Sequence, residues 1–216
     1  MQHVFGYGSL TFSPALPDAV IELRPAILPG HCRAFNKVSR SRSAPAAICF
    51  DPPGVIPTAF LRAQTRLSIT LGTTPAKDSI RGLLATYGDS PELIAVLDER
   101  EGYDPTESSH RSGYLPSLEI VDAGSPVAAR VYLTNHDPRC PYTATNLSLD
   151  QIAVILIGST PRSAVSEGPR ACGLDYLEGT RRALRAVDIV DPYLEALAAR
   201  VRSLPGPWIE RVAPVR

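Results

Sequence analysis

The 216-residue sequence predicts an α+β fold built on a largely antiparallel or mixed β-sheet. Strand-like runs fill most of residues 1–134, and one helical segment interrupts them. From residue 148 onward, the apolar residues repeat with the 3.6-residue period of helices. Strands first and helices later are typical of the α+β class, because regular alternation of strands and helices would instead indicate a parallel sheet.

The composition agrees with one globular domain. Hydrophobic residues make up 44% of the chain and charged residues 20%, which is typical of a protein that buries a core. We expect a single domain over residues 1–204, followed by a C-terminal tail over residues 205–216.

The predicted strands are apolar or alternating runs that end at Gly or Pro. In the first part of the chain they cover residues 2–6, 26–38, 46–50, 57–71 and 79–87. Two more strands, residues 113–121 and 126–134, follow the helical segment. The 21 prolines favour many short elements over long helices.

The helix between the strands is predicted from the sequence SPELIAVLDEREG, residues 90–102. Ser90 suits the N-cap and Pro91 the first helical position. Glu92 interacts favourably with the positive end of the helix dipole. Gly102 provides the C-terminal stop, because glycine adopts the left-handed conformation that often ends a helix.

Three helices are predicted after residue 148. Ser148 and Gln151 have the spacing of a capping box at the start of the first helix. Residues 173–187 form the second helix, with Tyr176 and Leu177 expected in the core. Asp191 caps the third helix ahead of a proline.

The charge balance argues against several classes of partner. Lys and Arg number 22, as do Asp and Glu, so the formal net charge is zero. Proteins that bind nucleic acid or an anionic membrane normally carry a basic excess. We therefore expect a small-molecule ligand, no nucleic acid and no membrane. The sequence makes no prediction of oligomeric state.

The cysteines and histidines lack the spacing of a metal or redox site. Cys32, Cys49, Cys140 and Cys172 are far apart in the sequence, as expected for buried thiols in a reducing compartment. No histidine pair has ligand spacing, so we predict no metal site. With no secretory signal and no apolar run of about 20 residues, we expect a cytoplasmic protein.

A glycine-containing loop follows the first strand, in VFGYGSLTF, residues 4–12. Gly6 and Gly8 resemble the opening of a dinucleotide-binding fingerprint. This fingerprint requires a third glycine at position 11, where the sequence has Thr11. Pro14 also interrupts the helix that would bind the pyrophosphate. Nor is there the Lys-Ser or Lys-Thr of a phosphate-binding loop.

Two interpretations of this loop remain open. Glycines leave backbone amides accessible, and consecutive amides in a turn form a nest that binds anions, including carboxylates. Ser9 adds a hydroxyl donor. The alternative is an ordinary tight turn.

Glu101 occupies a position where the helical period predicts an apolar residue. Leu97, Ile94 and Leu93 precede it by four, seven and eight residues, so all four lie on one face. Burial and the negative helix end would both raise the pKa of this carboxyl, toward the range of a general base near neutral pH. The alternatives are an ion pair with an arginine or a frayed, solvated helix end.

The two features together resemble the γ-glutamylcyclotransferase-like superfamily, and within it most closely the ChaC-type glutathione-specific enzymes. The likeness rests on FGYGSL at residues 5–10, Arg100-Glu101 and the following Gly102-Tyr103. A looser likeness covers GPRACGLDYLEGT, residues 168–180, and IVDPYLEAL behind it. The family's Arg-Gly-Thr-Pro segment is only RSAP here, residues 42–45, and residues 51–79 have no clear counterpart in the family's sequence pattern.

The resemblance implies a small β-barrel surrounded by helices. It also implies a cofactor-independent cyclotransferase that converts a γ-glutamyl peptide to 5-oxoproline by intramolecular aminolysis. Glu101 would be the catalytic acid and base. The implied substrate-binding residues are Tyr7, Gly8, Ser9, Leu10 and, more loosely, Tyr114.

Two other functions remain open. One is a non-catalytic binding module with the same fold, and the other is a cyclotransferase acting on γ-glutamyl-amines. The basic loop around Arg40 and Arg42 is compatible with an anion contact or with a solvated surface.

Overall fold

The computed structural model describes residues 1–39, 43, 67–160, 171–206 and 212. The predicted strand at 46–50, most of that at 57–71, and Arg40 and Arg42 lie outside these residues. Most of the tail predicted over 205–216 also lies outside them, so the division at residue 204 stays a prediction.

Five strands form a closed barrel in the order β1-β3-β2-β4-β5. Their bounds are Gln2–Gly6 for β1, Val20–Val38 for β2, Ile69–Tyr87 for β3, Tyr114–Asp122 for β4 and Pro126–Thr134 for β5. Four pairings are antiparallel, and β1 closes the barrel against β5 in parallel. The predicted α+β class with a small mixed β-barrel is therefore confirmed.

The long strands β2 and β3 differ from the prediction. Strand β2 begins at Val20 instead of 26, and β3 continues through residues 72–78, where a break was expected. The two strands pair with each other along most of their length, with irregularities that include the step between Pro29 and His31. Cross-strand pairing therefore maintains β structure through a Thr- and Pro-containing segment whose local sequence indicated a turn.

Helix α2, Leu93–Glu101, begins later than predicted. Residues 91–92 form a turn, and the Leu93 amide donates to the Ser90 carbonyl at 3.2 Å. No side chain caps this end, so the predicted Ser90 N-cap is wrong. The predicted stop is confirmed, because Gly102 has a left-handed conformation with φ +70°.

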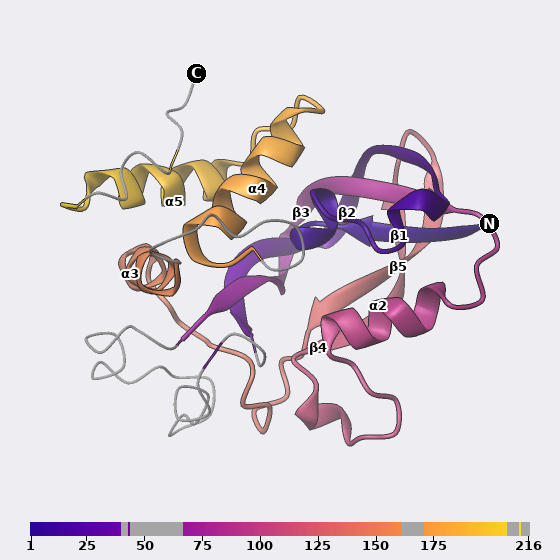
Figure 1. Cartoon of the computed structure of the whole chain (residues 1–216), viewed down its shortest axis with the longest axis horizontal. Coiled ribbons are helices and arrows are strands. Elements are labelled where there is room, and N and C mark those ends of the chain that lie inside the picture. The colour runs from indigo at the N-terminus through magenta and orange to yellow at the C-terminus, as the bar shows by residue number, and fades with distance from the viewer. Residues whose placement is uncertain (40–42, 44–66, 161–170, 207–211, 213–216) are drawn as a thin grey trace.

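The other three helices lie together beside one part of the barrel, away from α2 (Figure 1). They are α3, Leu149–Ser159; α4, Gly173–Arg185; and α5, Pro192–Ser203. Both polar bonds of the Ser148–Gln151 capping box form, and the Asp191 side chain accepts from the Leu194 amide at 3.0 Å. These two predicted caps are confirmed. No helix among the described residues is long and apolar enough to cross a bilayer.

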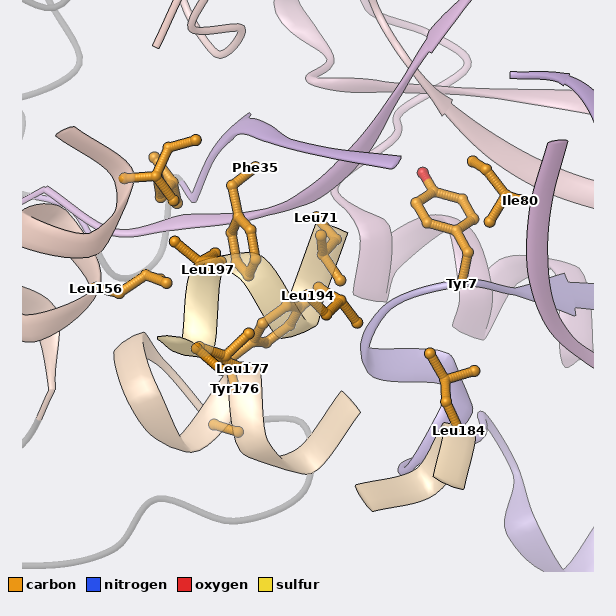
Figure 2. Close-up of a cluster of buried hydrophobic side chains, with 14 of the residues drawn as sticks. Tyr7, Phe35, Leu71, Ile80, Leu156, Tyr176, Leu177, Leu184, Leu194 and Leu197 are labelled. Carbon is orange, nitrogen blue, oxygen red and sulfur yellow. The ribbon is translucent and has the colours of Figure 1, made fainter. Parts of the chain in front are cut away.

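The buried side chains form two clusters. The larger one joins the barrel interior to α3, α4 and α5. In Figure 2, Phe35 and Leu71 of the barrel lie near Tyr176 and Leu177 of α4 and Leu194 and Leu197 of α5. The smaller cluster packs beneath α2 and contains Val4, Ala15, Ala85, Tyr87, Leu93, Leu97, Tyr114 and Tyr132.

Candidate active site

The glycine loop leaves β1 and turns at once into a short 3₁₀ segment, Ser9–Thr11. The Thr11 amide and hydroxyl both donate to the Gly8 carbonyl, at 2.9 and 2.7 Å, which fixes the turn. A side chain at position 8 would bring its Cβ to 2.5 Å from the Tyr176 hydroxyl. Glycine is required here because another part of the chain approaches the backbone closely.

The Tyr176 hydroxyl also accepts a hydrogen bond from the Ser9 amide at 3.1 Å. Tyr176 comes from α4, so this contact ties the helical layer to the loop. The prediction that Tyr176 belongs to the core is confirmed, since it is almost fully buried. Sequence reasoning did not detect that its hydroxyl reaches the loop.

Glu101 is the last residue of α2, and its side chain is only 11% exposed. The Nε atom of Arg100 lies 3.5 Å from its carboxylate. The position therefore combines two of the alternatives derived from the helical period, because the carboxylate is largely buried and is also paired with an arginine. A solvated, frayed helix end is excluded.

One small pocket gathers the loop and the carboxylate. Its lining residues are Phe5, Tyr7, Gly8, Ser9, Leu10, Leu71, Glu101, Tyr114, Tyr132 and Tyr176. All six residues singled out from the sequence are among them. The cavity proper measures about 20 Å³, and its empty space including the open mouth is about 280 Å³.

Sequence reasoning missed four of the lining residues: Phe5, Leu71, Tyr132 and Tyr176. Three of them lie on strands, where alternation shows which residues share a face but not which of these reaches a particular pocket. Phe5 stands inside the quoted FGYGSL motif and could have been included on that ground.

The phenol groups of Tyr7 and Tyr114 are buried donors. The Tyr7 hydroxyl donates to the Tyr132 carbonyl at 2.5 Å, and the Tyr114 hydroxyl donates to the Leu71 carbonyl. Burial, followed by the nearby Glu101 carboxylate, raises the pKa of Tyr7 well above its usual value. Burial is also the main cause that raises the pKa of Tyr114. Both therefore remain protonated at neutral pH and are hydrogen-bond donors rather than bases.

A polar cluster holds α2 against β5 one turn before Glu101. The Tyr132 hydroxyl and the Nη2 atom of Arg130 each donate to Asp98 Oδ1 at 2.6 Å. Arg130 Nε in turn donates to the Tyr132 hydroxyl at 2.9 Å. Since the Tyr132 carbonyl accepts from Tyr7, this one residue connects the helix that carries Glu101 with the glycine loop.

The part of the chain that the structure describes contains no set of side chains suited to bind a metal ion. There, no three His, Cys, Asp or Glu side chains come together in a way that could hold a metal ion.

This fold is the γ-glutamylcyclotransferase-like fold, as comparison with solved structures shows. Two are crystal structures of a γ-glutamyl cyclotransferase specific to glutathione from yeast, both 20% identical in sequence. One has a TM-score of 0.63 over 93% of this chain and 95% of the yeast chain; the other has 0.59 over 93% and 97%. YkqA from Bacillus subtilis is 15% identical, with a TM-score of 0.51 over 94% of this chain and 55% of YkqA.

The sequence itself has no comparable match. No protein-family model matches it, and no curated protein matches it. At these identities the likeness establishes the fold, whereas activity has to be argued from the residues of the pocket.

Proposed function

We propose that this protein is a γ-glutamylcyclotransferase, which converts a γ-glutamyl compound to 5-oxoproline and releases an amine or amino acid. The observation that carries the proposal is the shared pocket of the glycine loop and the largely buried Glu101 carboxylate. Keeping a carboxylate in such a place costs free energy, so a chain that needed only packing would favour leucine there.

The reaction is an intramolecular aminolysis. The substrate's α-amino nitrogen attacks its own γ-carbonyl carbon, a five-membered lactam closes, and the bond from that carbon to the leaving nitrogen breaks. Nucleophile and electrophile belong to one molecule, so the enzyme must mainly fold the substrate onto itself. Orientation of this kind contributes up to roughly 7–11 kcal/mol in model reactions.

Glu101 moves the proton in this scheme. Its carboxylate accepts a proton from the substrate ammonium group, which frees the nitrogen lone pair for attack. The carboxylic acid then returns a proton to the leaving nitrogen. Arg100 pairs with this carboxylate before substrate binds, with its Nε atom at 3.5 Å.

The glycine loop binds the substrate's α-carboxylate. The amides of Gly8, Ser9 and Leu10 are the donors, and an amide of the same loop stabilises the oxyanion that develops on the γ-carbonyl oxygen. At the Ser9 amide the carboxylate takes the place of the Tyr176 hydroxyl, because an ionised acceptor forms the stronger hydrogen bond. Tyr7 and Tyr114 form the wall of the pocket.

Glutathione is our first candidate substrate, supported by the yeast enzymes of the same fold. A γ-glutamyl-amine is the alternative, because RSAP at residues 42–45 replaces the family's Arg-Gly-Thr-Pro segment. We place the enzyme in the cytoplasm, which agrees with the free thiols of Cys32 and Cys140.

The test is 5-oxoproline release from glutathione, γ-glutamyl-alanine and γ-glutamyl-ε-lysine. Wild type, Glu101→Gln and Glu99→Gln are compared; Glu99 is an exposed carboxylate on the same helix. Release from at least one compound should fall about 10²-fold or more in Glu101→Gln, as expected for a lost general base. Glu99→Gln should release 5-oxoproline at the wild-type rate.

Two results would count against the proposal. Equal activity of Glu101→Gln and wild type would remove the assigned acid and base. No release from any compound, with folded wild-type protein, would favour a binding module that retains the pocket without turnover.

A further inference from the structure

We propose that Arg33 is a positioning residue for the glycine loop. Its side chain holds the peptide group between Tyr7 and Gly8 in the orientation in which the Gly8 amide binds a carboxylate. The inference rests on the proposed function only in taking the loop as the carboxylate site. It assigns a role to a side chain that does not line the pocket.

Arg33 is a deeply buried cation on β2, only 5% exposed. Its guanidinium group has three different partners. Nε donates to the Tyr7 carbonyl at 3.0 Å, Nη2 donates to the Arg81 carbonyl of β3 at 2.7 Å, and Nη1 pairs with the Asp191 carboxylate. One planar group thus joins the glycine loop, the barrel wall and the start of α5.

A structural ion pair alone does not require this arrangement. Burial lowers the pKa of Arg33 to about 10, so the group is still charged at neutral pH. A buried ion pair is often no more stabilising than apolar residues of the same shape. The pairing with Asp191 therefore leaves unexplained why the remaining donors are directed to backbone carbonyls, one of them in the loop.

The contact with Tyr7 acts on the neighbouring amide through the peptide bond. The Tyr7 carbonyl and the Gly8 N–H belong to one planar group. A charge-assisted hydrogen bond to the oxygen fixes the orientation of this group and polarises it, which makes the N–H a stronger donor.

Arg181 provides a matched control. It is 2% exposed and is also a buried cation, but it pairs with the carboxylates of Glu178 on α4 and Glu195 on α5. Loss of either arginine should destabilise the fold. Only loss of Arg33 should reduce the preference of the protein for a ligand that carries a carboxylate over the same ligand without one.

The experiment compares binding of 5-oxoproline and 2-pyrrolidinone, the same lactam without the carboxylate, by calorimetry. Wild type, Arg33→Lys, Arg33→Met and Arg181→Met are measured. Arg33→Met should weaken 5-oxoproline binding about tenfold or more, the scale of one charge-assisted hydrogen bond, and leave 2-pyrrolidinone binding nearly unchanged. Arg33→Lys should recover part of the loss, and Arg181→Met should retain the wild-type ratio of the two affinities.

The Arg33→Met/Asp191→Asn double variant covers the case in which Arg33→Met does not fold. It removes the uncompensated buried carboxylate, while asparagine still caps α5. It should show the same loss of discrimination as Arg33→Met.

Three results would overturn the inference: equal weakening of both ligands by Arg33→Met, the same change in Arg181→Met, or a wild type that does not prefer the carboxylate ligand. These measurements do not require turnover. A wild type that binds 5-oxoproline selectively through Arg33 but releases none from substrates would refute the proposed function and support this inference.

Discussion

The two clusters of buried side chains differ in chemistry, and the candidate site lies where they meet. The larger cluster is mainly aliphatic and joins the barrel to α3, α4 and α5. The smaller cluster contains Tyr87, Tyr114 and Tyr132 beneath α2. One pocket is lined by tyrosines from both clusters: Tyr7 and Tyr176 from the larger one, and Tyr114 and Tyr132 from the smaller one.

This difference suggests a division of labour. Aliphatic packing stabilises without direction, because the hydrophobic effect depends on buried area. Buried phenols combine area with a directional hydrogen bond. The aliphatic side chains of the larger cluster should therefore determine mainly stability. The smaller cluster, together with Tyr7 and Tyr176, should determine mainly the placement of the loop and the carboxylate.

The largest expected effect is on stability, in the larger cluster. Leu197→Ala in the fully buried face of α5 should lower the free energy of unfolding by about 2–5 kcal/mol, through lost burial and a cavity. The KM of the protein that remains folded should not change. Denaturant unfolding and kinetics at a temperature below the transition test both parts. Leu118→Ala, at a 75% exposed position of β4, is the control, with an effect within about 0.5 kcal/mol.

A substitution in the smaller cluster should separate activity from stability. Tyr132→Phe retains the ring and the carbonyl that accepts from Tyr7 but removes the hydroxyl bonded to Asp98 and Arg130. Loss of a hydrogen bond to a charged group costs about 1.5–3 kcal/mol.

Because α2 then loses one of its fixed contacts with β5, kcat should fall while KM stays nearly constant. Steady-state kinetics with thermal unfolding on the same samples measure this. Tyr103→Phe, a tyrosine beside Glu101 that is not in the pocket lining, should leave kcat unchanged. A loss of stability without any change in kcat would contradict the division of labour.

The local features of the site were predictable from the sequence, but their partners were not. Gly8 and Glu101 stand out because each departs from a local pattern. Gly8 follows a strand directly and leaves the backbone accessible, and Glu101 is a carboxylate at the end of an apolar helix face. Tyr176, Tyr132 and Arg33 depart from no local pattern. Their roles depend on contacts between residues far apart in the chain, such as the bond from Ser9 to Tyr176.

The same distinction explains the errors in the strands, whereas the wrong N-cap at Ser90 was a local error, because residues 91–92 form a turn and α2 begins only at Leu93. The caps at Ser148 and Asp191 were predictable because a cap is formed within four residues. The extents of β2 and β3 were not, because their pairing overrides the local turn signal at residues 72–78.

The contact between the glycine loop and Tyr176 of the larger cluster can be tested with Gly8→Ala. The added methyl group would lie 2.5 Å from the Tyr176 hydroxyl, and overpacking of this kind costs about 1–3 kcal/mol. Substrate affinity should fall as well, because the loop must move. Gly8→Ala/Tyr176→Phe removes the obstructing oxygen and should recover part of the stability. Unfolding free energies of the four proteins in the cycle measure the coupling, and strict additivity would show that the hydroxyl is not the obstacle.

The smallest expected effect is on the pH dependence of stability. The folded protein raises the pKa of Tyr114, so its neutral phenol contributes stability that is fully present below the unfolded pKa of about 10. This stability is lost as the pH rises further toward the folded pKa. Wild type should therefore lose about 1.4 kcal/mol per pH unit more than Tyr114→Phe above pH 10. Denaturant unfolding at several alkaline pH values measures the two slopes. Parallel slopes would show that Tyr114 ionises without opposing the fold, and the smaller cluster would then not depend on its buried phenol.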